Sequence, residues 1–152
     1  MSIIYLNGKF IPQQEAKISV MDRGFLFGDG VYEVIPVYDD HMLGLQQHLD
    51  RLKHSLNMIH MTTPLTDQEW ITIFETLLEK NNQTSGIQSI YLQVTRGPQE
   101  TRAHVLPDTY TPTVLAFLIP SKSQDGMEPI YSRLFLSNQP KTSSNVCKLS
   151  MG

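Results

Sequence analysis

The sequence predicts an α+β fold, in which a mixed, largely antiparallel sheet carries two helices on one face. Runs of β-branched and aromatic residues recur along the chain between turn residues, which is typical of strands. Two longer segments, residues 45–59 and 66–78, instead repeat their apolar residues every three or four positions, as amphipathic helices do. With 152 residues, 40% of them hydrophobic, the chain is long enough to bury a core between such a sheet and its helices.

The N-terminus predicts a β-hairpin. Apolar segments 3–6 and 9–11 flank the pair Asn7-Gly8, and a two-residue turn of this kind needs residues that accept a positive φ. Pro12 has no backbone N–H, so it ends the second arm or places it at a sheet edge. Residues 16–20 predict a further short strand.

A glycine-rich turn over residues 23–30 leads directly into a strand over residues 31–38. Alternation along that strand places Tyr32 on one face and Glu33 on the other. A carboxylate between valines at the head of a strand is unusual for a purely structural segment. On composition alone Glu33 is expected on a solvated face, because charged residues are mostly exposed; if this turn forms part of a site, Glu33 is instead expected near the polar network of that site. The turn glycines are Gly24, Gly28 and Gly30.

The first predicted helix, over residues 45–59, has one apolar stripe with His48 and Arg51 on its margin. Arg51 is either a solvated rim residue or reaches into a site, where its planar guanidinium suits a phosphate or a carboxylate. The second helix begins at a capping box, with Thr66 as N-cap and Glu69 reaching back to its amide. The residues of the apolar stripe are Leu45, Leu49, Leu52, Leu56 and Ile59.

A loop with several basic residues follows the predicted strand over residues 90–95. It contains Arg96, Arg102 and His104, and loops at strand ends are common places for chemistry. Arg102 and His104 are two positions apart, so in extended backbone their side chains point the same way. Together they suit a carboxylate, and a solvated polar loop is an equal alternative. Two more strands are predicted, over residues 113–119 and 130–136.

Composition and motifs argue against several classes of function. A net charge of −3 gives no basic surface for nucleic acid. The single cysteine, Cys147, excludes a disulfide within the chain and favours a reducing compartment. No secretory leader and no apolar run of ~18 residues is found, so we expect a cytoplasmic protein without a membrane partner. Phosphate-loop, dinucleotide-binding and zinc-ligand patterns do not occur, so no metal is expected.

Residues 23–34, which read Arg-Gly-Phe-Leu-Phe-Gly-Asp-Gly-Val-Tyr-Glu-Val, resemble the signature of the class IV, or fold-type IV, pyridoxal-phosphate enzymes. This group holds D-amino-acid aminotransferases, branched-chain aminotransferases and 4-amino-4-deoxychorismate lyases. Residues 48–52, His-Leu-Asp-Arg-Leu, match a helix of the family. The resemblance implies that Arg51 contacts the phosphate of the cofactor, pyridoxal 5'-phosphate, and that the protein is an enzyme.

The element Arg102-Ala103-His104, after Val-Thr-Arg-Gly at residues 94–97, resembles the D-amino-acid aminotransferase subgroup in particular. The resemblance implies that Tyr32, Arg102 and His104 bind the α-carboxylate of the substrate. It therefore implies transamination between a D-amino acid and a 2-oxo acid, by a homodimer. Branched-chain enzymes usually have phenylalanine in place of Tyr32, and they and the lyases lack the Arg-Ala-His element.

The resemblance also implies one lysine that carries the cofactor and moves the substrate proton. Lys148 and Lys141 are the candidates, and the spacing from Arg102 favours Lys148 as the catalytic and cofactor-binding residue. Lys141, followed by Thr142, resembles a variant found in some lyases. A lyase that eliminates pyruvate from aminodeoxychorismate is therefore one alternative function.

Members of the family are considerably longer than this chain, because a second domain supplies further groups around the cofactor. We therefore expect residues 1–120 to form an N-terminal α+β domain, and residues 121–152 to form the interdomain connection and the start of a C-terminal domain. The chain alone is expected to bind pyridoxal phosphate poorly and to be inactive, because charge pairs left in water are weak. A branched-chain aminotransferase and a non-catalytic lobe are further alternatives.

Overall fold

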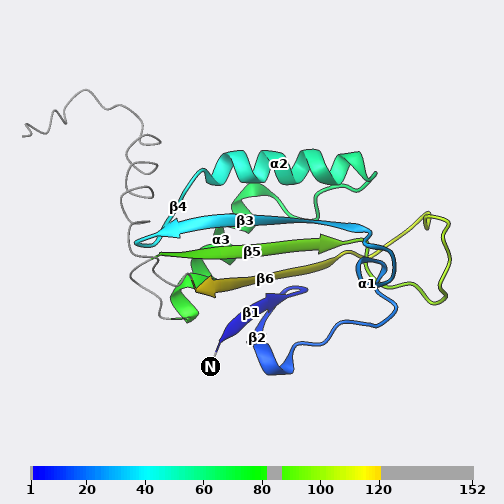
Figure 1. The fold of residues 1–152 in the computed structure, drawn as a ribbon, viewed down its shortest axis with the longest axis horizontal. Coiled ribbons are helices and arrows are strands. Elements are labelled where there is room, and N and C mark those ends of the chain that lie inside the picture. The colour runs from blue at the N-terminus through cyan, green and yellow to red at the C-terminus, as the bar shows by residue number, and fades with distance from the viewer. Residues whose placement is uncertain (1, 82–86, 121–152) are drawn as a thin grey trace, which may run out of the picture.

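The computed structural model describes residues 2–81 and 87–120, which form an antiparallel sheet with two long helices against it (Figure 1). The predicted strand over residues 130–136 and the segment 121–152 lie outside the described residues, so the division at residue 120 stays a prediction. The strands are β1 (Ile3–Leu6), β2 (Lys9–Pro12), β3 (Gly30–Tyr38), β4 (His41–Met42), β5 (Ile87–Thr95) and β6 (Thr113–Pro120). The helices are α1 (Arg23–Phe27), α2 (Leu45–Met58) and α3 (Asp67–Lys80), with a 3₁₀ turn, η1 (Gln13–Glu15).

The described strands form one six-stranded sheet in the order β2-β1-β6-β5-β3-β4, and every recorded pair of neighbours is antiparallel. β3 and β5 pair along their whole length, from Gly30 opposite Thr95 to Tyr38 opposite Ile87. The predicted hairpin at Asn7-Gly8 joins β1 to β2, and both turn residues have a positive φ. The predicted fold class, α+β with a largely antiparallel sheet, is confirmed.

Both long helices pack on the same face of the sheet, as predicted (Figure 1). The leucine stripe of α2 is buried at Leu49, Leu52 and Leu56, in a core that includes alternate residues of β3 and β5. α3 begins at the predicted capping box, in which the Thr66 hydroxyl accepts from the Glu69 amide and the Glu69 carboxylate accepts from the Thr66 amide. No helix among the described residues is both long and apolar enough to cross a membrane.

The opposite face of the sheet carries a row of aromatic side chains. Tyr91 of β5 stacks on Tyr32 of β3, with ring centroids 5.8 Å apart, and on Phe117 of β6, at 4.9 Å. The alternation of β3 separates Tyr32, on this face, from Glu33, on the face that the helices cover. Two adjacent residues of one strand therefore reach different surroundings.

Two local predictions differ from the structure. The glycine-rich turn is in part a helix, α1, because the Asp22 carboxylate caps it by accepting a hydrogen bond from the Gly24 amide. The strand predicted over residues 16–20 is wrong. Residues 16–20 pair with no strand among the described residues, and the apolar side chains of Ile18 and Val20 are exposed.

Close packing, more than a positive φ, explains the glycines of this segment. A Cβ on Gly24 would collide with the Thr95 side chain, and one on Gly30 would lie 2.7 Å from the carbonyl oxygen of Val94. Only Gly28 of the three has a positive φ, 67°, where it ends α1. The glycines therefore let α1 and the start of β3 lie directly against the end of β5.

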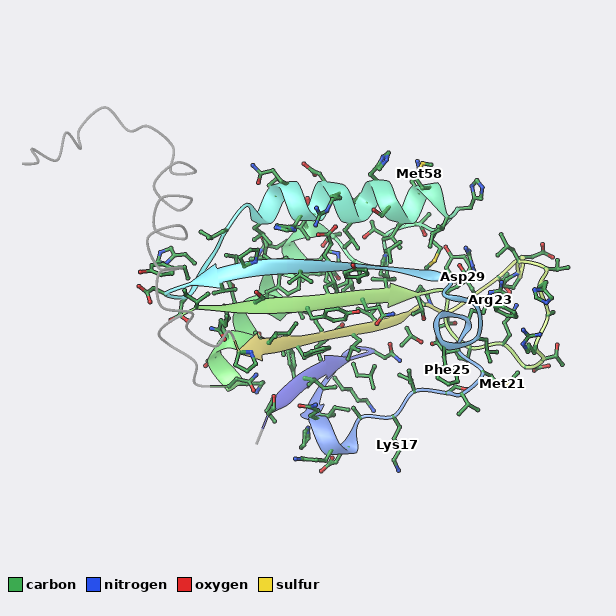
Figure 2. All side chains as sticks on the ribbon, viewed as in Figure 1. Lys17, Met21, Arg23, Phe25, Asp29 and Met58 are labelled. Carbon is green, nitrogen blue, oxygen red and sulfur yellow. The ribbon has the colours of Figure 1, made fainter. Side chains whose placement is uncertain are left out.

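A buried ion-pair cluster holds this end of the sheet together. Asp29, between α1 and β3, accepts hydrogen bonds from Arg23 Nε at 2.6 Å and from Arg96 Nε at 2.8 Å. Arg96 also donates to the carbonyl oxygens of Ile59 and His60, which follow α2. Figure 2 shows Arg23 and Asp29 together at the end of the sheet where α1 lies. One carboxylate thus joins α1, the start of β3, the end of β5 and the end of α2.

The same contacts determine the protonation of Asp29. Burial by itself raises the pKa of this carboxyl, but the hydrogen bonds and charges of Arg96 and Arg23 outweigh burial and hold the pKa below its ordinary value. A carboxyl whose pKa is lowered by folding stabilises the fold fully above its ordinary pKa of about 3.9. That contribution is lost as the pH falls through the lower pKa of the folded state.

We predict that Asp29→Asn lowers the free energy of unfolding at neutral pH by roughly 3 kcal/mol, because two buried guanidinium groups lose their counter-charge. The free energy of unfolding should also depend less on pH below about pH 4, where the native chain loses the Asp29 contribution. Urea unfolding followed by circular dichroism, at neutral and acidic pH, measures both effects. Asp108→Asn, at an exposed loop position, is the matched control, and equal effects of the two substitutions would contradict the prediction.

Candidate functional site

One edge of β3 is open over the first part of the strand. β5 pairs with one edge along the whole strand, whereas β4 pairs on the other edge only with Val37 and Tyr38. Within residues 2–81 and 87–120, no strand pairs with this second edge over residues 30–35, which we name the open edge of β3. α2 runs beside β3, so its side chains reach the open edge (Figure 1).

Glu33 is the buried centre of the open edge, with 2% of its side chain exposed. Its carboxylate accepts hydrogen bonds from Arg51, through Nε at 2.7 Å and Nη2 at 2.6 Å, and from His48 Nδ1 at 2.8 Å. His48 and Arg51 are three positions apart on α2, so they lie on the same side of the helix. The expectation that Glu33 lies on a solvated face is therefore wrong, because these two partners compensate its charge and allow its burial.

The contacts of Glu33 also set its charge. Burial by itself raises the pKa of the Glu33 carboxyl, but the hydrogen bonds from Arg51 and His48 outweigh burial and hold the pKa below its ordinary value. Glu33 is consequently ionised at neutral pH. The hydrogen bond to Glu33 in turn raises the pKa of Arg51.

Arg51 keeps hydrogen-bond donors that its partner Glu33 does not use. Glu33 holds two of the three guanidinium nitrogens, and Nη1 has no recorded hydrogen-bond partner in the described part of the chain. The Arg51 side chain is 63% exposed, although the carboxylate that fixes it is buried. A planar, permanently charged group with free N–H donors suits a phosphate, so these residues fit the phosphate end of pyridoxal phosphate.

Tyr32 precedes Glu33 in β3, and strand alternation places its side chain on the face opposite the Glu33–Arg51 contact. Tyr32 is 65% exposed, and its ring is held from one side by the stack on Tyr91. Its hydroxyl is therefore available to a ligand on the aromatic face of the sheet.

Arg102 and His104 both contact Phe27 of α1. Cζ of Arg102 lies 4.8 Å from the centre of the Phe27 ring, and the centre of the His104 ring lies 5.1 Å from it. Both side chains are exposed, so they are accessible to a ligand. No hydrogen bond or ring contact is recorded between either of them and Tyr32 in the parts of the chain that the structure describes.

Sequence reasoning missed two features of the site. His48 has a partner in Glu33, although the sequence places it only beside the apolar stripe; helical spacing and the alternation of β3, taken together, could have found this pair. The contact of Phe27 with the loop after β5 has no local signal, because it depends on the path of that loop. Lys148 and Lys141 lie outside the described residues, so the choice between them stays a prediction.

Known sequences resemble this chain over most of its length. The family model described as amino-transferase class IV matches residues 30–149. The D-alanine aminotransferase of Listeria monocytogenes serotype 4b (strain F2365) is 37% identical over 107 residues, which are 70% of this chain and 36% of that protein. The D-alanine aminotransferase of Staphylococcus haemolyticus is 39% identical over 126 residues, which are 82% of this chain and 43% of that protein.

Solved structures agree on the fold. The branched-chain amino acid aminotransferase of Escherichia coli matches with a TM-score of 0.73 at 23% identity, over 84% of this chain and 42% of that chain. The branched-chain aminotransferase of the archaeon Thermoproteus uzoniensis, solved with norvaline, matches with a TM-score of 0.67 at 22% identity, over 78% of this chain and 40% of that chain. This chain thus spans less than half the length of each protein compared. With the family model matching from β3 onward, the chain belongs to the class IV aminotransferases.

Proposed function

We propose that this chain is the N-terminal part of a pyridoxal-phosphate-dependent aminotransferase, which moves the amino group of a D-amino acid such as D-alanine to a 2-oxo acid. The observation that carries the proposal is that Arg102 and His104 both contact Phe27, because a cation and an imidazole held against one ring suit a carboxylate. The relatives named as D-alanine aminotransferases support the choice of substrate. We further propose that the full-length enzyme is a cytoplasmic homodimer.

Arg51 would hold the phosphate of the cofactor. Its Nη1 is free to donate, and Glu33 keeps the guanidinium at the open edge of β3. His48 donates to the same carboxylate, which leaves Glu33 fewer ways to turn away from Arg51. When bound, pyridoxal phosphate supplies an electron sink for the charge left on the substrate α-carbon.

Tyr32, Arg102 and His104 would bind the α-carboxylate of the substrate. Arg102 supplies the positive charge, while the hydroxyl of Tyr32 and the imidazole of His104 supply hydrogen-bond donors. Such a clamp orients the α-carbon, so that its hydrogen faces the group that removes it. Lys148 would be that group, as acid and base, and would also carry the cofactor.

We predict that borohydride reduction of the full-length enzyme with pyridoxal phosphate fixes the cofactor to Lys148, as shown by peptide mass mapping. Lys148→Ala should abolish the labelled peptide, whereas the matched variant Lys141→Ala should retain it. Labelling of Lys141 alone would overturn the assignment. The 152-residue chain without further sequence should be labelled only weakly. It supplies only one side of the site, so the cofactor stays exposed to water and its charge pairs are weak.

An aminodeoxychorismate lyase is the second candidate function, favoured by the pair Lys141-Thr142. It uses the same cofactor but eliminates pyruvate. Parallel assays, one with D-alanine and 2-oxoglutarate and one with aminodeoxychorismate, separate the two reactions. Turnover of aminodeoxychorismate alone would refute the aminotransferase.

We predict that Glu33→Gln weakens the binding of pyridoxal phosphate by the full-length enzyme about tenfold, because Arg51 loses a charge-assisted hydrogen bond worth roughly 1.5 kcal/mol. An absorbance titration with the cofactor measures the dissociation constant. Glu75→Gln, at an exposed position on α3, is the matched control. An unchanged dissociation constant in Glu33→Gln would show that Glu33 does not position Arg51.

We predict that Arg102→Ala raises KM for D-alanine by a factor on the order of 10 to 100, because the substrate carboxylate loses a charged partner. The absorption spectrum of the bound cofactor should stay unchanged, since Arg102 does not face the phosphate in this proposal. Steady-state kinetics and the spectrum together test this. Lys80→Ala, which removes another cation over an aromatic ring, Phe10, is the matched control. A disturbed spectrum with an unchanged KM would refute the assignment.

A further inference from the structure

Phe27 is the common contact of three basic side chains. The guanidinium carbon of Arg23 lies 4.7 Å from the centre of its ring, that of Arg102 lies 4.8 Å away, and the His104 ring lies 5.1 Å away at an interplanar angle of 51°. A cation over the face of an aromatic ring is attracted by the ring quadrupole, also at an exposed site. The same ring thus contacts both Arg102 and His104, although both side chains are exposed.

Arg23 holds the backbone of the same loop. Its side chain is only 4% exposed, and its Nη1 donates to the carbonyl oxygens of Ala103 at 2.8 Å and Val105 at 3.4 Å. These two carbonyls stand on either side of His104 in the chain. Nη1 also donates to Gln99 Oε1 at 2.7 Å, at the start of the loop. The loop is thus fixed both through its main chain and through the side chains that lie on Phe27.

α1 is itself placed by buried contacts, so it can act as a rigid support. Asp22 caps it and also accepts hydrogen bonds from the hydroxyls of Thr95, at 2.7 Å, and Thr113, at 2.6 Å. Asp29 fixes the other side of Arg23. These links run from the ends of β5 and β6 through α1 to the loop.

We propose that Phe27 and Arg23 are positioning residues, which fix Arg102 and His104 in the orientation that binds the carboxylate of a small substrate. The inference rests on the proposed function, because it assumes that Arg102 and His104 bind that carboxylate. Free arginine and histidine side chains in an exposed loop would lose rotamer freedom each time a substrate bound. A support that orders the two side chains before the substrate binds removes this entropy loss. It therefore lowers KM without taking part in the reaction.

Phe25 provides a matched control on the same helix. It is also a phenylalanine of α1, it is 72% exposed, and it has no recorded ring contact with an arginine or a histidine among the described residues. Figure 2 shows it at the outside of α1. Phe25→Leu and Phe27→Leu therefore remove the same chemical group from one helix, but only the second removes the support.

The contact is tested without activity by NMR of the full-length enzyme labelled with 13C-histidine. The ring current of Phe27 should displace the His104 ring signals, which are assigned by their absence in His104→Gln. Phe27→Leu should shift these signals, while Phe27→Tyr and Phe25→Leu should leave them in place. His104 signals that are the same in Phe27→Leu and in the native enzyme would overturn the inference.

Steady-state kinetics test whether Phe27 lowers KM through Arg102 and His104. Phe27→Leu should raise KM for D-alanine about fivefold, equivalent to roughly 1 kcal/mol, with kcat and the cofactor spectrum unchanged. Phe27→Tyr should restore the native KM, since tyrosine keeps the ring face. If Arg102→Ala raises KM but Phe27→Leu does not, the positioning inference is overturned and the proposed function stands. If Arg102→Ala leaves KM unchanged, the proposed function fails, and the inference that rests on it fails with it.

Discussion

One carboxylate, Asp29, lies between two buried guanidinium groups, and much of the structure depends on it. Without it, Arg23 and Arg96 would be uncompensated charges in the interior, which is far more costly than a lost hydrogen bond. With it, each arginine can use its remaining donors on backbone carbonyls. Arg96 reaches the end of α2 and Arg23 reaches the loop after β5, so a single charge fixes segments that lack regular structure of their own.

The elements that are determined by residues close together in the sequence could be predicted from the sequence. Asn7-Gly8 accepts the positive φ of a tight hairpin, and Thr66 with Glu69 satisfies the first backbone groups of α3. The apolar period of α2 likewise predicted which face is buried. The wrong strand over residues 16–20 has a different origin. Whether an apolar segment becomes a strand depends on tertiary pairing that local sequence does not determine, and residues 16–20 pair with no strand among the described residues.

The partners of Glu33 show which part of the site could not be predicted from neighbouring residues in the sequence. The apolar neighbours of Glu33 in the sequence marked it as unusual but could not name its partners, because His48 and Arg51 lie 15 and 18 residues away on a different element. Spacing predicted that Arg102 and His104 could point the same way, but their shared contact, Phe27, could be found only from the path of the loop. The role of Lys148 still rests on family resemblance alone.

The open edge of β3 has a consequence for self-association. An unpaired strand edge is a template on which another extended chain can add by β-pairing. The amide of Leu43 donates to the carbonyl of Pro36, so the carbonyl of Pro36 points outward along this edge, and the N–H that proline lacks would have pointed the same way. Because Leu43 already occupies the carbonyl of Pro36, an incoming strand could pair only along residues 30–35, where it meets the charged head of Arg51 beside Glu33. The edge that is accessible to a small anion is thus a poor seed for aggregation.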